Sequence, residues 1–109
     1  MAETLKILGQ SAPAASTNTT FYTVPASTSA TVSTITICNT NASAVTVRLH
    51  TAASGGSATT SNANYYGITI GANDTLALTG GITLATGEFL VAWASSTLVC
   101  FQAYGVEVT

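Results

Sequence analysis

Charged side chains are nearly absent from this chain. Its 109 residues include two basic and four acidic side chains, a charged share of 6%, against about 25% in average soluble proteins. General acid–base catalysis and metal binding need several ionisable side chains gathered at one place. With so few of them and a single histidine, the sequence predicts neither an enzyme nor a cofactor or metal site. It indicates a structural protein instead.

Basic residues and long apolar runs are also scarce. The formal net charge is −2, and two basic side chains cannot supply the about six or more phosphate contacts of typical DNA-binding proteins. No stretch reaches the roughly 18 consecutive apolar residues of a transmembrane helix, and the N-terminal segment lacks the apolar run of a signal peptide. We therefore expect no nucleic acid and no membrane as partners, and synthesis in a cytoplasm without export.

The chain has only two cysteines, Cys38 and Cys100, which permit a single disulfide. Disulfides are rare in proteins that stay in a reducing compartment. We therefore expect two reduced, buried thiols. Neither cysteine has a basic neighbour in sequence that would activate it as a nucleophile.

What the chain does have is alternation of apolar and polar residues. The clearest case is the segment 45–50 (VTVRLH). Its three apolar residues are predicted to face a core, and Thr46, Arg48 and His50 to face outward. Further strands are predicted at 21–24, 30–38, 65–70, 75–79, 82–84, 89–94 and 98–108.

About eight short strands separated by turns are typical of an antiparallel β-sandwich or a small barrel. We interpret the chain as a single all-β sandwich domain, a size that its length also indicates. The pattern does not separate an immunoglobulin-like from a jelly-roll-like sandwich. Val32 is out of phase with Ile35 and Ile37, which predicts a bulge or burial on both faces.

The first 18 residues look different from the rest. Gly9, Pro13 and a run of small residues argue against a helix or a buried strand. We interpret residues 1–18 as an extended N-terminal arm that precedes a sandwich domain at 19–109. The large apolar residues of this arm are candidate contacts with a neighbouring subunit: Leu5, Ile7 and Leu8.

A second segment, residues 52–64, is predicted to be a long polar loop. Loops of this composition lie on the surface and are the most mobile parts of a domain. Its exposed tip is predicted to be Ser54, Gly55, Gly56 and Ser57.

Arg48 and His50 share the predicted outer face of one strand. Together they could bind an anionic group, but two solvated or interface side chains are the simpler interpretation. A single histidine without a carboxylate or cysteine partner cannot build a zinc site.

The aromatic residues allow two interpretations. Trp93 lies in an apolar stretch, which favours a core position. In each of the pairs Phe21–Tyr22 and Tyr65–Tyr66, one ring is expected to pack inward and the other to lie on the surface. Sugar stacking or anchoring of an interface is the alternative.

Several segments match a pattern known from one family. They are LGQSAPAA (8–15), FYTVPA (21–26), ATVSTI (30–35), ICN (37–39), Ile70, NDT (73–75), LT (78–79), GITLA (81–85) and FQAYGVEV (101–108). In these segments the chain resembles small virion structural proteins of tailed bacteriophages, described as capsid decoration (cement) or tail-associated proteins. Residues 52–64 depart from the pattern, because the relatives carry bulkier and more charged residues there.

The resemblance implies a β-sandwich that forms a homotrimer on the surface of a virion. The expected function is that of a capsid decoration protein that binds the assembled shell and stabilises it. Its partners would be the major capsid protein or other virion proteins. A tail or neck component of the same virion is the first alternative, and a carbohydrate-binding or adhesin module is the second.

Overall fold

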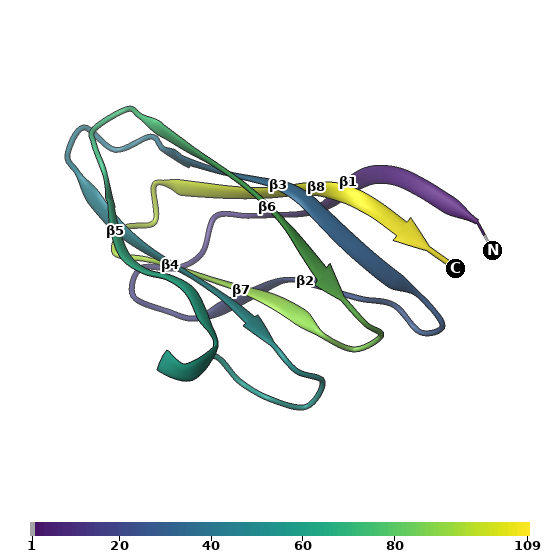
Figure 1. The fold of residues 1–109 in the computed structure, drawn as a ribbon. Coiled ribbons are helices and arrows are strands. Elements are labelled where there is room, and N and C mark those ends of the chain that lie inside the picture. Colours follow the sequence, from purple (N-terminus) through teal and green to yellow (C-terminus); the bar gives the residue numbers. More distant parts are fainter. Residues whose placement is uncertain (1) are drawn as a thin grey trace.

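The computed structural model describes residues 2–109, which form two four-stranded antiparallel sheets packed face to face (Figure 1). The strands are β1 (Glu3–Ser11), β2 (Thr19–Thr23), β3 (Ser29–Asn39), β4 (Val45–Ala52), β5 (Ala63–Ile70), β6 (Thr75–Leu84), β7 (Phe89–Ala94) and β8 (Val99–Val108). One turn of 3₁₀ helix, η1 (Thr60–Asn62), precedes β5. The predicted all-β sandwich is confirmed.

The strand order decides the topology. Sheet A has the order β1-β8-β3-β6, and sheet B has the order β2-β7-β4-β5. The first strand thus pairs with the last, the second with the seventh, the third with the sixth and the fourth with the fifth. This nested pairing is a long hairpin folded over into two sheets, the arrangement of an eight-stranded jelly roll. Of the two topologies left open by the sequence, the chain has the jelly roll.

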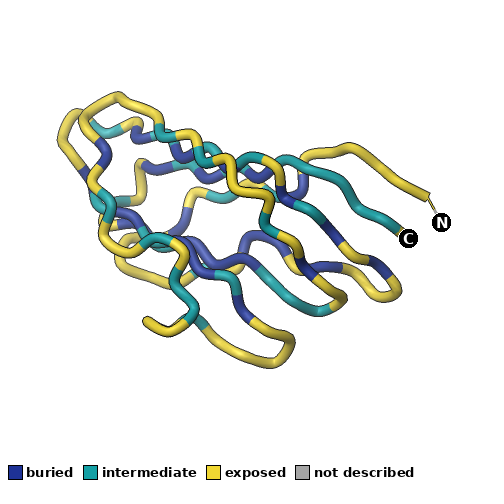
Figure 2. The backbone as a smooth tube through the Cα atoms, in the orientation of Figure 1, coloured by how far each residue is buried: buried dark blue, intermediate teal, exposed yellow. Residues whose placement is uncertain are grey.

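The core lies between the two sheets. The predicted inward residues of β4 are buried, with exposed fractions of 3%, 0% and 0% for Val45, Val47 and Leu49. Figure 2 shows the alternation of buried with less buried positions along the strands. The largest fully buried side chains are Phe101, Ile35, Ile37, Leu49 and Leu90.

The N-terminal segment belongs to the sandwich. The sequence separated residues 1–18 as an arm, but Glu3–Ser11 forms β1 and pairs with β8 along its length; Met1 lies outside the described residues. A register shift between Ile7 and Gly9 turns Leu8 into the core, where its exposed fraction is 8%. Without β1, one side of β8 would be an unpaired sheet edge. Because these backbone groups are available for pairing, residues 3–11 form a strand despite their weak strand pattern.

The irregularity predicted near Val32 is a bulge. The pairing of β3 with β8 shifts register between Val32 and Thr34. The pairing with β6 shifts at the same place, and Gly81 of β6 takes a φ of 59° there. Because glycine tolerates this conformation, β6 continues through it. The two strands predicted at 75–79 and 82–84 are therefore one.

Gly105 lies where the backbone of β8 comes close to that of β3. A Cβ atom at this position would lie 2.0 Å from the carbonyl oxygen of Thr31. Gly105→Ala is therefore expected to push the strands apart and to lower the free energy of unfolding by about 1–3 kcal/mol, seen as a lower urea midpoint. Gly71→Ala is the control, since a Cβ there has nothing within 4 Å. Equal midpoints for the two variants would contradict the close approach.

Candidate functional site

Three large side chains form a row across the outer face of sheet B. Arg48 of β4 is paired in register with Tyr66 of β5 and with Trp93 of β7. The guanidinium carbon of Arg48 lies 4.2 Å from the ring centroid of Tyr66 and 3.9 Å from that of Trp93. A cation within about 6 Å of an aromatic face is attracted by the ring, so both rings hold the arginine. Tyr66, Arg48 and Trp93 are called the arginine row below.

His50 lies next to this row along β4 and is buried. The sequence predicted a solvated or interface side chain, but the exposed fraction of His50 is 3% within the single chain. Its Nδ1 lies 3.1 Å from Oδ1 of Asn62, and its ring meets Tyr66 edge-on with centroids 6.4 Å apart. The side chain does point away from the core, but the loop that follows β4 covers it. The prediction was therefore right about the direction and wrong about solvation.

The hydrogen bonds of Asn62 fix the role of His50. Nδ2 of Asn62 donates to the carbonyl oxygen of Ser57 at 2.8 Å, and Oδ1 accepts from the backbone N–H of Thr59 at 2.9 Å. Because Oδ1 can only accept, Nδ1 of His50 carries the proton and donates to it. His50 thus anchors the loop to β4. No sequence signal identified this role, because it depends on a loop folding back over its own strand.

The loop between β4 and β5 covers residues 53–62, slightly less than the predicted 52–64. The four residues of the predicted tip, 54–57, are all exposed. The following residue, Ala58, lines a shallow pocket with Phe89 and Val91 on the outer face of sheet B. The loop is therefore held at two places that both follow its tip, against the sheet at Ala58 and by His50 at Asn62.

Arg48 has no anionic partner among residues 2–109. Its Nε is buried and has no hydrogen-bond partner. The salt bridge found in the described part of the chain joins Lys6 to Glu107 instead. Arg48 is half-buried on the outer face, where the sequence predicted a solvated or interface side chain. Within the described chain its charge is therefore met by aromatic rings alone.

The aromatic residues divide between core and surface differently from the predictions. Trp93 was expected in the core but lies half-buried in the arginine row. Tyr65 packs against the core, and Tyr66 has an exposed fraction of 54%, so the prediction for this pair is confirmed. In the other pair both Phe21 and Tyr22 are buried, and the expectation of one surface ring is wrong.

Tyr22 takes part in a polar contact between the two sheets. Its hydroxyl donates to Oε2 of Glu107 at 2.7 Å, and Nζ of Lys6 donates to Oε1 of the same carboxylate at 3.2 Å. The hydrogen bond from Tyr22 and the contact with Lys6 hold the pKa of Glu107 below its ordinary value, although burial opposes this. Burial, together with Glu107, raises the pKa of Tyr22 well above its ordinary value. The contact ties β1 and β8 to β2.

Glu107→Gln is expected to reduce the loss of stability in acid. Because the folded pKa of Glu107 is lowered, its carboxylate stabilises the fold above about pH 4.3, the ordinary glutamate value. This contribution disappears as the pH falls through the lower folded value. Urea unfolding should show a larger loss for the wild type than for the variant between about pH 7 and about pH 2. Glu3→Gln, at an exposed position, is the control, and equal losses in wild type and Glu107→Gln would contradict this role.

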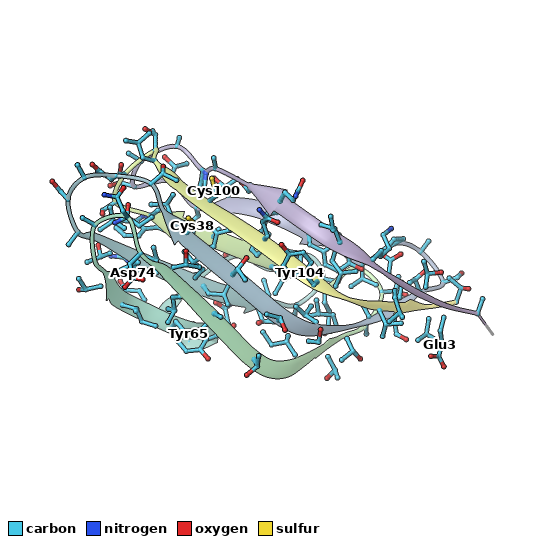
Figure 3. The ribbon with its side chains drawn as sticks, turned by 90° about the horizontal axis from the view of Figure 1, so that it is seen from above. Glu3, Cys38, Tyr65, Asp74, Cys100 and Tyr104 are labelled. Atoms are coloured by element: carbon cyan, nitrogen blue, oxygen red, sulfur yellow. The ribbon has the colours of Figure 1, made fainter. Side chains whose placement is uncertain are left out.

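The three candidate contact residues of the N-terminus do not stay together. Leu8 belongs to the core of its own chain, so it offers nothing to a neighbour. Leu5 and Ile7 have exposed fractions of 86% and 51%. They pair in register with Val106 and Tyr104 of β8. Figure 3 looks down on the outer face of sheet A and labels Tyr104 there. Two of the three residues are therefore available on the surface.

Cys38 and Cys100 lie directly opposite each other on β3 and β8 (Figure 3). Both thiols are free, which agrees with the expected reduced state, but they are half-buried where burial was expected. Residues 2–109 contain no group of three or more histidine, cysteine or acidic side chains that could hold a metal ion. The outer face of sheet A therefore carries two neighbouring thiols without further ionisable partners.

Comparison with protein-family models, with curated proteins and with solved structures finds no match to this chain. In the part of the chain that the structure describes, no helix is long and apolar enough to cross a membrane. The function is therefore inferred from the fold, the surfaces and the resemblance noted in the sequence.

Proposed function

We propose that this chain is a bacteriophage capsid decoration protein that binds the assembled shell as a homotrimer and stabilises it. Its partner is the major capsid protein or another virion protein. The observation that carries the proposal is the outer face of sheet A, which has exposed apolar side chains and almost no charge. Leu5, with an exposed fraction of 86%, and Ile7, with 51%, are its most prominent members.

The fold supports this proposal by analogy. Eight-stranded jelly rolls recur in viral capsid domains and also in lectins. A fold alone does not define a function, because one architecture serves many. The jelly roll therefore supports the virion proposal and the carbohydrate-binding alternative equally. The chemistry of the molecular surface decides between them.

The surface chemistry favours assembly. Charged residues are depleted at the cores of protein interfaces. On the outer face of sheet A, the charged side chain nearest to Leu5 and Ile7 is Glu3, at one end of β1. β1 is also the outermost strand of sheet A, and within residues 2–109 no strand is hydrogen-bonded to its outer edge, which lies against the backbone of Phe21 at Gly9. An unpaired edge and an uncharged face together suit a protein that works in contact with neighbours.

The mechanism is thermodynamic linkage. A protein that binds the assembled shell more tightly than its separate subunits stabilises the shell by mass action. The symmetry of a shell repeats each site many times, so that a modest contact at one site adds up over the particle. No catalytic group is needed for this function.

The test is to locate and count the protein on particles. Purified virions should contain it in a number that scales with the number of shell subunits, measured by quantitative mass spectrometry, with matching density over the shell in cryo-electron microscopy. Density confined to the tail or one vertex would replace the proposal with the tail or neck alternative. Absence from the particles would overturn both.

Changing the exposed residues of β1 should weaken shell binding. The double variant Leu5→Ser/Ile7→Ser is expected to fold normally, because both side chains are exposed, and to bind stripped shells at least about tenfold more weakly, a loss of about 1.4 kcal/mol or more. Leu98→Ser, at a position with an exposed fraction of 50%, is the control. Deleting the whole segment is a poorer test, since β1 also supplies Leu8 to the core. Equal binding of the double variant and the wild type would show that shell binding needs this face neither for contact with the shell nor for contact between the subunits of the trimer.

The carbohydrate-binding alternative has one observation in its favour. Tyr66 is exposed on the outer face of sheet B, where a sugar ring could stack on it. Arg48 already contacts this ring at 4.2 Å, which leaves less aromatic surface for a sugar. Binding of a bacterial surface polysaccharide that is lost in Tyr66→Ala would establish this alternative.

A further inference from the structure

Two charged side chains in residues 2–109 have neither an ion-pair partner nor a hydrogen-bond partner, and their charges are opposite. Of the other charged side chains, Lys6 and Glu107 form an ion pair at 3.2 Å. Asp74 and Glu88 accept hydrogen bonds from the backbone amides of Thr75 at 2.8 Å and of Ala85 at 2.6 Å. Arg48 and Glu3 are thus the cation and the anion that have neither kind of partner.

Arg48 and Glu3 cannot meet within one molecule. Arg48 lies on the face of sheet B that is turned away from the core. Glu3 lies at the start of β1, the outermost strand of sheet A. The core separates the two sheets, and Figure 3 shows Glu3 at the end of the molecule where the chain begins. A contact between these two side chains therefore requires a second copy of the chain.

The arginine row has the properties of a receptor for a carboxylate. Tyr66 and Trp93 hold the guanidinium group on both sides, so little freedom remains to be lost when an anion binds. The planar guanidinium group presents a fork of N–H donors that matches a carboxylate, and no acceptor in the described residues uses it. Tyrosine, tryptophan and arginine are also the residue types most enriched where binding energy concentrates in protein interfaces.

We propose that Arg48 binds the carboxylate of Glu3 from a second copy of this chain. The docking segment is 3–7, in which Leu5 and Ile7 project to the same side as Glu3. A strand rises about 3.3 Å per residue, so Leu5 follows Glu3 at a spacing of about 6.6 Å. This spacing allows the carboxylate to reach Arg48 while Leu5 covers the exposed ring of Tyr66. The charged groups of Arg48 and Glu3 and the exposed side chain of Leu5 are then buried in one contact between two copies.

This contact is heterologous, because the surface that donates Glu3 differs from the surface that receives it. Heterologous contacts produce closed rings or open filaments. A ring of three is the homotrimer of the proposed function, so the inference rests on that oligomer and names the contact that builds it. It does not depend on a shell, and it can be tested with the purified chain alone.

The test is a charge exchange followed by the mass of the protein in solution. Sedimentation equilibrium of the full-length wild type should give a concentration-dependent oligomer. Glu3→Arg and Arg48→Glu should each weaken self-association by at least about tenfold, as expected for a close interfacial charge pair. The double variant Glu3→Arg/Arg48→Glu should recover most of the loss, because the pair is restored with its charges exchanged.

Controls separate this pair from general effects of charge and folding. Thr97→Glu adds a negative charge at an exposed turn and should leave the oligomer unchanged. Urea unfolding of each variant reports whether it is folded. At concentrations low enough for the wild type to be monomeric, Glu3→Arg should be as stable as the wild type, because Glu3 is exposed in the single chain. A monomeric wild type, an unchanged mass in Glu3→Arg, or a double variant without recovery would each overturn the proposal.

The outcome is distinguishable from a failure of the proposed function. If the charge exchange restores the oligomer but no particle contains the protein, the contact stands and the virion function falls. If wild type and Arg48→Glu bind shells equally well while both are monomers, shell binding stands, and both the homotrimer and the contact fall.

Discussion

Phe101→Ala is expected to lower the free energy of unfolding by about 3–5 kcal/mol, the usual cost of removing a buried phenylalanine side chain. Phe101 lies on β8, and its exposed fraction is 0%. Its ring lies 5.9 Å from that of Phe21 on β2, tilted by 48°. The pair therefore joins sheet A to sheet B. A cavity at this point cannot be closed by one side chain, because it lies between two sheets whose spacing is set by all the other contacts.

Urea unfolding measures this effect directly. Leu98→Ala, at a half-exposed position, is the matched control and should change the free energy of unfolding by less than about 0.5 kcal/mol. A loss below about 1 kcal/mol in Phe101→Ala, no more than an average substitution, would mean that the two sheets are not held together by this ring pair.

The parts of the fold that could be predicted are those where one face of a strand is buried and the other is not. On β4, apolar and polar residues alternate strictly, and Val47 and Leu49 lie in the core as predicted. On β7 both faces carry large apolar residues. Leu90 and Ala92 lie in the core, whereas Trp93, which the sequence placed in the core, lies on the opposite face of the strand. The deciding information is Arg48 on the neighbouring strand, which is known only once β4 and β7 are paired.

The predictions that failed depend on contacts between segments far apart in the chain. Residues 3–11 have a weak strand pattern because an edge strand exposes most of its side chains. They form β1 because the edge of β8 is available to them. His50 was expected in solvent because nothing in its own strand covers it. The loop that ends at Asn62 covers His50 instead, and nothing in the amino-acid sequence indicates that this loop folds back over β4.

The strand order could not be predicted either, because it is a property of pairings. The immunoglobulin-like and jelly-roll alternatives differ in which strands are neighbours and share the same run of short strands. The bulge near Val32 was predictable, since a change of phase within one strand is visible in the sequence itself. Local departures from alternation are thus readable, whereas long-range pairings are not.

Asn39 is a buried polar residue that holds together two segments far apart in the chain. Asn39 ends β3, and its exposed fraction is 0%. Its Oδ1 accepts from the backbone N–H of Asn41 at 2.9 Å. The two N–H bonds of its Nδ2 are shared among three acceptors, the carbonyl oxygens of Ser43, Ile70 and Gly71, at 3.0, 3.2 and 3.0 Å. One amide group thus joins the β3–β4 loop to the β5–β6 turn.

Asn39→Asp is therefore expected to cost about 3–5 kcal/mol near neutral pH, the range for an unpaired buried charge. A carboxylate cannot donate, and it would face three carbonyl oxygens. Both burial and these oxygens disfavour the charged form, so the pKa of the introduced carboxyl group in the folded chain rises above its unfolded value of about 3.9. The penalty should be smallest below about pH 3.9, where the group is protonated in both states, and should grow as the pH rises through the raised folded value.

The comparison of variant with wild type by urea unfolding at each pH cancels the acid loss that Glu107 causes in both proteins. Asn41→Asp is the matched control, because it makes the same change two residues away, where the side chain is half-buried and donates to Oγ of Ser96 at 3.3 Å. Its penalty should be smaller and less dependent on pH. If the penalty in Asn39→Asp were independent of pH, the buried amide would not be what joins the two segments. The join would then depend on backbone hydrogen bonds such as that from the N–H of Asn39 to the carbonyl oxygen of Asp74, at 2.9 Å.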